Sequence, residues 1–279
     1  MTTYFIATTG NDTTGNGTFG NPWATISKAV SSSIVGDTIV CAAGTYTWAS
    51  QTFTTDRFII GSGASTCIFD AGASTTVSWA SANAATSITG IKFQNLNLNG
   101  NLGVAPFKLA GATASLSFTS CIFTNITAAG GNWGFFSTDN GGNIVGTFTL
   151  IGCLFYHVTG GGNNAPVFSL ENTISLAIAL TNCTFYSNEL VAITMPFVVS
   201  FGTTLTIALI NNIIYNANGT PKGFGAVTSS SGTNNDIIGY SSAPALANQL
   251  STDPLFVDAV NANFNLRPTS PCIDAGTPI

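Results

Sequence analysis

Two acidic residues, Asp139 and Glu171, are the side chains in this sequence whose positions best suit catalysis or ion binding. Asp139 and Glu171 each follow a short apolar segment, and an asparagine comes directly after each of them. Hydrolysis of a glycosidic bond uses two carboxyl groups about 5–10 Å apart, one of them protonated. The same oxygen atoms can instead hold Ca²⁺ weakly, or the two side chains can be solvated turn carboxylates. The pair is therefore our candidate for catalysis or for calcium binding.

A basic or nucleophilic partner for this pair is not evident. The sequence contains six lysine and arginine residues, which are scattered along the chain, and one histidine, His157. A lone histidine without a neighbouring nucleophile is usually structural. The sequence also lacks the Cys-x-x-Cys or Cys/His spacing that is typical of a zinc site. We expect no cofactor, apart from calcium if the acidic pair binds it.

Aromatic residues give a second chemical signal. Tyr156, Tyr186 and Tyr215 each follow the last apolar position of a repeated segment, so strand alternation points their rings outward as a ladder. Stacked rings with hydroxyl groups suit sugar faces or a partner subunit. Trp133 lies where it can extend such a surface. The alternative is that a loop covers the rings, or that they only stack on one another.

The elements that position these residues belong to a repeat. Five segments share an alternating pattern with one bend, and they start at residues 91, 116, 148, 178 and 207, with offsets of 25, 32, 30 and 29. An irregular period of this size is typical of a solenoid with variable loops. The segments are Ile91–Leu98, Leu116–Phe123, Phe148–Phe155, Ile178–Phe185 and Ile207–Ile214.

Each repeat contains two short strands separated by a bend. The residue at the bend is Asn95, Ser120, Gly152, Asn182 or Asn211, and glycine and asparagine enter the left-handed backbone region most readily. A third strand per coil is expected upstream of the repeated segments. Its four occurrences are Phe107–Leu109, Phe135–Ser137, Val167–Ser169 and Phe197–Val199.

Cysteines occupy one position of the repeat. Cys121, Cys153 and Cys183 follow the bend in successive segments, and Cys67 is expected to hold the same position earlier. Residues stacked about 4.8 Å apart with parallel side chains have poor disulfide geometry. We therefore expect a ladder of small buried thiols. The fold class that follows is an all-β, right-handed parallel β-helix with three strands per coil.

Both ends of an open β-helix need caps. Pro22–Ser33 is expected to form a short N-terminal capping helix. The chain then divides into an N-terminal cap (1–36), coils (37–250) and a closing segment (251–279), all within one domain.

The two ends also carry a family resemblance. The opening Tyr4-Phe5-Ile6-Ala7, Asn21-Pro22-Trp23-Ala24 and Gly36-Asp37-Thr38-Ile39, and the closing Asp253-Pro254-Leu255-Phe256 and Ser270-Pro271-Cys272-Ile273, resemble the pectate-lyase-like family of right-handed β-helix proteins. This resemblance implies an enzyme that cuts polysaccharide by β-elimination or hydrolysis. It also implies carboxylates that hold Ca²⁺ and an arginine or lysine base for the lyases, or clustered aspartates for the hydrolases.

Composition narrows the classes of partner. Only 6% of residues are charged and the net charge is −5, so the chain has no basic stripe for nucleic acid. No apolar run is long enough for a membrane-spanning helix, so membrane insertion is not expected. A surface with so little charge repels its own copies weakly and favours self-association.

The start of the sequence lacks a basic and apolar signal segment. We expect an extracellular, cell-surface or virion location, with a trimmed N-terminus or an unusual export route. The function expected from the residues is a non-catalytic structural or adhesive protein, a self-associating subunit of a fibre, filament or viral appendage. The alternatives are a polysaccharide lyase or glycoside hydrolase, and a carbohydrate-binding module that uses the tyrosine flank.

Overall fold

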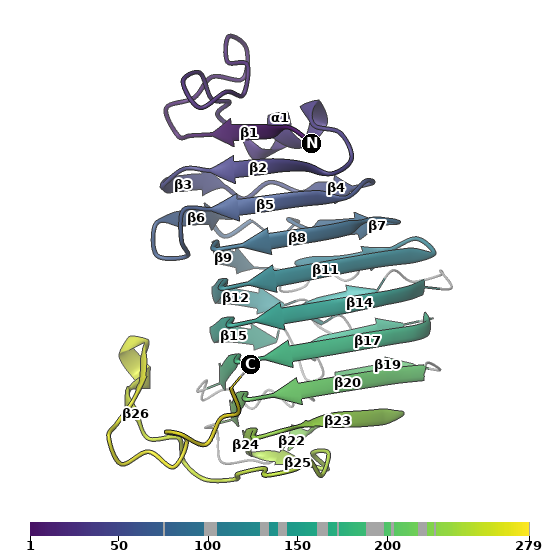
Figure 1. The fold of residues 1–279 in the computed structure, drawn as a ribbon, viewed down its shortest axis with the longest axis vertical. Helices are drawn as coiled ribbons and strands as arrows, with labels where there is room; N and C mark the ends of the chain where they lie inside the picture. Colours follow the sequence, from purple (N-terminus) through teal and green to yellow (C-terminus); the bar gives the residue numbers. More distant parts are fainter. Residues whose placement is uncertain are drawn as a thin grey trace.

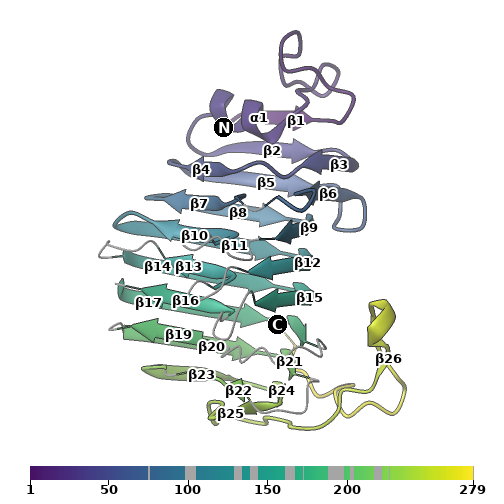
Figure 2. The ribbon, with the colours of Figure 1, turned by 180° about the vertical axis from the view of Figure 1, so that it is seen from behind.

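Parallel coils stacked along one axis make up the protein. The computed structural model describes residues 1–74, 76–97, 105–128, 134–138, 144–160, 167–171, 173–187, 198–201, 204–216, 222–225 and 227–278. Three parallel sheets line the stack around one apolar core (Figures 1 and 2). The predicted right-handed parallel β-helix is confirmed.

The largest sheet has nine strands among the described residues, and consecutive strands of the sheet come from successive coils. In spatial order they are β1 (Thr3–Ile6), β2 (Asp37–Cys41), β5 (Arg57–Gly61), β8 (Ala85–Thr89), β11 (Thr113–Thr119), β14 (Ile144–Ile151), β17 (Thr173–Thr181), β20 (Thr204–Ile210) and β23 (Ser229–Thr233).

The second sheet has eight described strands and follows the first bend of each coil. They are β3 (Gly44–Thr47), β6 (Cys67–Asp70), β9 (Lys92–Asn97), β12 (Ile122–Ala128), β15 (Leu154–Gly160), β18 (Thr184–Ser187), β21 (Ile213–Asn216) and β24 (Asp236–Ile238). The third sheet has six, namely β4 (Gln51–Phe53), β7 (Trp79–Ala82), β10 (Phe107–Ala110), β13 (Phe136–Thr138), β16 (Phe168–Glu171) and β19 (Val198–Phe201).

Strand pairing confirms the repeat from its second segment onward and corrects the first. Leu116 pairs with Phe148, but on its other side it pairs with Thr86, so the equivalent segment starts at residue 86 and the offset is 30. The predicted segment Ile91–Leu98 is therefore out of register. The cause is that the coil has two bends that use asparagine, and the prediction matched Asn95 to the wrong one.

The backbone dihedrals separate these two bends. The first bend holds left-handed residues with φ between 51° and 66°: Gly90, Ser120, Gly152, Asn182, Asn211 and Asn234. Asn95 lies level with Asn125 and His157, inside the second sheet, where φ is 60°, 52° and 50°. The predicted bend residues are thus confirmed except for Asn95, which belongs to the second bend.

The third-sheet strands begin one residue later than predicted in three coils. Phe107 pairs with Phe136, which pairs with Phe168, which pairs with Val198. The prediction started these last three strands at residues 135, 167 and 197. Phe135 and Phe136 are both fully buried, so apolar alternation gave no basis for choosing between them.

The predicted cysteine column is confirmed and continues as asparagine. Pairing of the following residues places Cys67, Ile91, Cys121, Cys153, Cys183, Asn212 and Asn235 at one level of successive coils. All six cysteines are free thiols. Each thiol from Cys121 to Cys183 donates to a carbonyl of the preceding coil, and Asn212 and Asn235 use their Nδ2 groups in the same way.

Phenylalanine rings stack through the centre of the coils. Phe69, Phe93, Phe123, Phe155 and Phe185 occupy one level of the second sheet, and successive ring centroids lie 5.9, 5.5, 4.4 and 4.3 Å apart. Their side chains are at most 5% exposed. The apolar residues that dominate the composition are therefore concentrated in an aromatic core.

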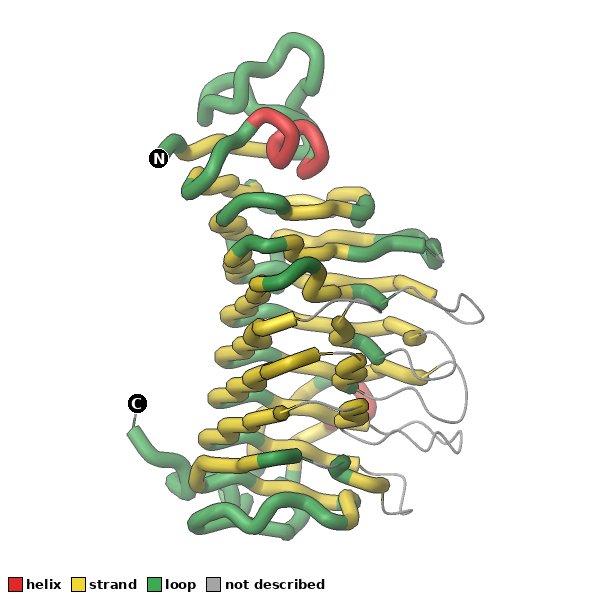
Figure 3. Tube along the Cα trace, turned by 90° about the vertical axis from the view of Figure 1, so that its right-hand side faces the viewer, coloured by secondary structure: helices red, strands yellow, loops and turns green. Residues whose placement is uncertain are grey.

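The N-terminal helix is shorter than the predicted Pro22–Ser33, and a strand precedes it. Helix α1 spans Ile26–Ser32, and the Thr25 hydroxyl caps it by accepting the Lys28 N–H. Pro22 lies in the preceding loop, which leads in from β1, and β1 already pairs with β2. Figure 3 shows the helix at one end of the straight stack.

The closing segment folds back beside the second sheet. It contains β26 (Phe256–Asp258), the 3₁₀ turn η1 (Ala259–Asn261) and β27 (Asn263–Leu266), which form a small antiparallel hairpin. Two short parallel strands, β22 (Lys222–Gly223) and β25 (Tyr240–Ser241), lie near the end of the last coil. Among the described residues, no helix is long and apolar enough to span a membrane.

Candidate functional site

The predicted acidic pair falls at the limit of what the structure describes. Asp139 and Trp133 lie outside the described residues. Glu171 ends β16, but its side chain is not among those described. Within the described part of the chain, no group of three or more histidine, cysteine and acidic side chains is placed to hold a metal ion. Catalysis or calcium binding by Asp139 and Glu171 therefore stays a prediction.

The tyrosine ladder exists, but the closing hairpin covers it. Tyr156 pairs with Tyr186, and Tyr186 pairs with Tyr215, so the three residues are in register as predicted. Phe264 packs on Tyr156 and Tyr186, each at 5.3 Å between ring centroids, and Phe256 also packs on Tyr186. Tyr186 is only 9% exposed. The prediction of an open tyrosine flank is thus wrong at Tyr186, because residues far along the chain return to cover it.

A small cavity of about 290 Å³ remains between the hairpin and the last two rings of the ladder. Tyr215 and Tyr186 form part of its wall, and Asp253, Asp258 and Arg267 lie on the hairpin side. Burial, with the nearby Asp253 carboxylate, raises the pKa of Tyr215. Sugar binding by the tyrosines remains a prediction, restricted by this geometry to a small cavity.

Asp236 holds the closing segment against the last coil. Its carboxylate accepts the Thr252 N–H and the Cys272 thiol, each at 3.1 Å, and its side chain is 3% exposed. Burial, and to a smaller extent Asp253, raises the pKa of Asp236. Burial and the Asp236 carboxylate raise the pKa of Cys272 to about 12, so the thiol keeps its proton at neutral pH.

We expect Asp236→Asn to make the free energy of unfolding less dependent on pH. Because the folded pKa of Asp236 lies above its ordinary 3.8, its contribution to stability is fully present below that value. This contribution is lost as the pH rises through the folded pKa. Urea unfolding at pH 3, 5 and 7 should therefore show a flatter profile for Asp236→Asn than for the native chain. The exposed Asp274→Asn is the control, and a native chain that loses more stability on acidification than Asp236→Asn would contradict the expectation.

The outer face of the nine-stranded sheet is a second surface that could bind a ligand. We call it the hydroxyl face. Its outward residues in β2, β5, β8, β11, β14, β17, β20 and β23 are serine, threonine, alanine and aliphatic or aromatic residues, and none is charged. They are Thr38, Val40, Phe58, Ile60, Ala85, Ser87, Thr89, Thr113, Ser115, Ser117, Thr119, Val145, Thr147, Thr149, Ile151, Ser175, Ala177, Ala179, Thr181, Thr204, Thr206, Ala208, Ile210, Ser229, Ser231 and Thr233.

A groove of about 450 Å³ crosses one margin of this face, where β8, β11 and β14 begin. Small residues form it: a Cβ at Gly146 would lie 2.5 Å from the Ala114 carbonyl oxygen, so glycine is required there. The lining residues are Asp56, Asn83, Ala84, Ala85, Thr113, Ala114, Ser115, Val145, Gly146 and Thr147. The groove thus runs across three coils, along the axis of the stack.

Polar groups with fixed positions stand at one end of the groove. One carboxylate oxygen of Asp56 accepts the Ala85 N–H at 2.8 Å. The Asn83 side-chain oxygen accepts the N–H groups of Ala112 and Thr113 at 2.7 and 3.3 Å. These bonds hold both side chains by their oxygens, so that a second carboxylate oxygen and an amide NH₂ are available to a ligand.

Sequence reasoning did not find Asp56 or Asn83. Alternation in the strands does predict which hydroxyl residues point outward. Neither residue belongs to a strand, however, and they approach the groove from successive coils through side-chain bonds to the backbone of the following coil.

Comparisons with known proteins concern the fold. No protein-family model and no curated protein matches the chain. Among solved structures, a rhamnogalacturonan lyase is 13% identical, with a TM-score of 0.41, over 85% of this chain and 75% of that chain. The pectate lyase Pel9A is 14% identical, with a TM-score of 0.42, over 100% of this chain and 92% of that chain.

An alginate lyase from Paenibacillus sp. str. FPU-7 is 13% identical, with a TM-score of 0.44, over 90% of this chain and 92% of that chain. At this identity the similarity extends to the fold and to nothing finer.

Proposed function

We propose that this protein binds an uncharged polysaccharide along the groove of the hydroxyl face, without cutting it. The observation that carries the proposal is an open groove across three coils, on a face whose outward strand residues are uncharged, with Asp56 and Asn83 at one end. This function agrees with the predicted location outside the cell, at the cell surface or on a virion, which stays a prediction.

The chemistry of the groove supports an uncharged polymer. Binding clefts are typically apolar, with a few polar groups that fix orientation. Here Ala85 and Val145 offer apolar surface to the C–H faces of sugars. Hydroxyl, amide and carboxylate groups at Ser115, Asn83 and Asp56 match sugar hydroxyls. A polymer without charge also loses little solvation on such a face.

The groove offers little for cleavage. Glycoside hydrolysis needs two carboxyl groups, and Asp56 is the one carboxylate among the described lining residues. No lysine or arginine lines it to act as a base. Binding is therefore a better proposal for the groove than the lyase or hydrolase that the family resemblance implies.

Co-sedimentation with insoluble cellulose, chitin and β-1,3-glucan tests this proposal. Ser115→Trp should fill the groove and weaken binding at least about tenfold, whereas Thr181→Trp, on the same face outside the groove, should not. Asp56→Asn keeps an acceptor for the Ala85 N–H and should weaken binding by a smaller factor. Equal binding by Ser115→Trp and the native chain would contradict the proposal. Release of reducing or unsaturated ends from any polysaccharide, including pectate and alginate, would favour the enzyme instead.

Self-association through the hydroxyl face is a second candidate function. It is favoured by exposed apolar side chains on that face, since Phe58, Ile60 and Ile151 are 42%, 41% and 41% exposed. Sedimentation velocity over a range of concentrations tests it. Thr149→Arg, which places a charge at the centre of the face and outside the groove, should then abolish any dimer. A native chain that stays monomeric at high concentration would exclude this candidate.

A further inference from the structure

The third sheet ends one strand earlier than the first sheet at the N-terminal side. Beyond β4 it has no further strand among the described residues, whereas the first sheet continues through β2 to β1. Helix α1 takes the corresponding position and contacts β4. The strand β4 is therefore an edge strand, and an edge presents unpaired backbone groups.

Strand register identifies which backbone groups point to that edge. The Gln51 N–H donates to the Ser78 carbonyl at 3.0 Å, so Gln51 directs its hydrogen-bonding groups toward β7. In a parallel pair, successive residues of a strand direct these groups to opposite sides. Thr52 must consequently direct its N–H and C=O away from β7, toward α1.

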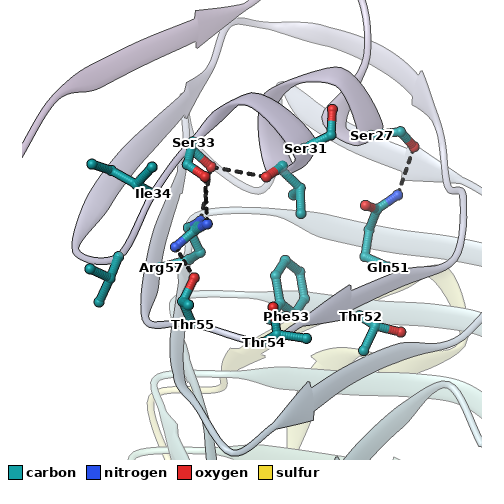
Figure 4. A pocket seen from close by; sticks show the side chains of 12 residues that line it. Ser27, Ser31, Ser33, Ile34, Gln51, Thr52, Phe53, Thr54, Thr55 and Arg57 are labelled. Carbon is teal, nitrogen blue, oxygen red and sulfur yellow. Dashed lines mark hydrogen bonds between the residues drawn. The ribbon is translucent and has the colours of Figure 1, made fainter.

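A groove of about 620 Å³ separates α1 from this edge (Figure 4). Polar bridges join its two walls at both ends. The Gln51 amide donates to the Ser27 hydroxyl at 2.7 Å, and the Arg57 guanidinium donates to the Ser33 hydroxyl at 2.8 Å and to the Ser33 carbonyl at 2.7 Å. Between the bridges, the exposed residues Thr52 and Thr54 lie along the groove.

The groove selects an uncharged occupant. Arg57 is its one charged residue, and Arg57 is 6% exposed and bonded to Ser33, Thr55 and the Asp56 carbonyl. At the rim of the groove, Ile34 and Val35 are 68% and 61% exposed and form an apolar surface. Backbone groups at the edge and aliphatic residues at the rim suit an extended peptide with small hydroxyl and β-branched side chains.

We propose that the groove between α1 and β4 is a strand-addition site, which binds an extended, uncharged peptide segment of a partner protein to the backbone of Thr52. The site is separate from the hydroxyl face, and the inference does not depend on the polysaccharide proposal. It places a protein partner at the capped N-terminal end of the stack.

The full chain and the probe peptide acetyl-Thr-Val-Thr-Val-Thr-amide test this proposal. Fluorescence anisotropy of a labelled peptide should show saturable binding. The Thr52 amide should exchange with solvent quickly in the free protein, and at least about tenfold more slowly with peptide bound. The same peptide with alternate backbone amides N-methylated keeps its side chains and should fail to bind.

A matched pair of variants provides the decisive comparison. Thr52→Pro removes the edge N–H without touching the ladder to β7, and proline is tolerated on edge strands. It should weaken peptide binding about tenfold, while Thr52→Val binds like the native chain. Equal binding by the N-methylated peptide, or unchanged affinity in a folded Thr52→Pro, would overturn the proposal. A dimer of the protein alone that Thr52→Pro abolishes would also overturn it, because a second copy would then fill the groove.

Discussion

Phe123→Ala is expected to lower the free energy of unfolding by about 4 kcal/mol. The Phe123 side chain is fully buried, and its ring stacks on Phe93 at 5.5 Å and on Phe155 at 4.4 Å. Rings of the neighbouring strands also meet its edge, including Phe107 and Phe118, each at 5.4 Å. Removal of the ring leaves a cavity in the middle of the stack, where no loop can collapse into it. Urea unfolding followed by tryptophan fluorescence measures the loss.

Phe123→Leu serves as its control. Leucine fills most of the space and loses the ring stacking, so the expected loss is about 1.5 kcal/mol. A solenoid couples each coil chiefly to its two neighbours, so a fully formed cavity can also split the unfolding transition. A loss below about 1 kcal/mol for Phe123→Ala would contradict the continuous aromatic core.

Asn212→Ala is expected to lower the free energy of unfolding by about 3 kcal/mol. The Asn212 side chain is 1% exposed and joins three coils. Its oxygen accepts the Cys183 N–H at 2.9 Å, and its Nδ2 donates to the Leu180 carbonyl and to Asn235, each at 2.9 Å. Alanine leaves a buried N–H and a buried C=O without these partners, and unsatisfied buried groups are costly. Denaturant unfolding at constant pH tests the expectation.

The chain itself supplies the control for this substitution, because earlier coils carry cysteine at the same level. Cys153 and Cys183 donate their thiols to the Phe118 and Leu150 carbonyls, at 3.5 and 3.4 Å. Asn212→Cys should therefore retain the bond to the Leu180 carbonyl and lower the free energy of unfolding by only about 1 kcal/mol. Equal losses for Asn212→Ala and Asn212→Cys would show that the column is not held by these bonds.

Local sequence patterns were sufficient for the architecture of the coils. Alternation around the bend residues Ser120, Gly152 and Asn182 placed the first two strands of each coil in the register that the pairing confirms. These features depend on neighbours a few residues away, and a one-residue slip would move the whole apolar set to the wrong face. The cysteine column followed from the same register. Where two apolar residues are adjacent, as at Phe135 and Phe136, the alternation does not indicate which of them begins the strand.

Tertiary structure alone decided which surfaces are open. Alternation pointed Tyr186 outward correctly, but the hairpin that carries Phe256 and Phe264 covers it from about 70 residues further along the chain. The groove at Asp56 and Asn83 likewise depends on side-chain bonds between successive coils. The free edge at Thr52 depends on where α1 replaces a strand. The alternation within a strand determines to which side each of its side chains points. Whether that side is exposed depends on other segments, such as the closing hairpin, which pack on it and which the alternation does not predict.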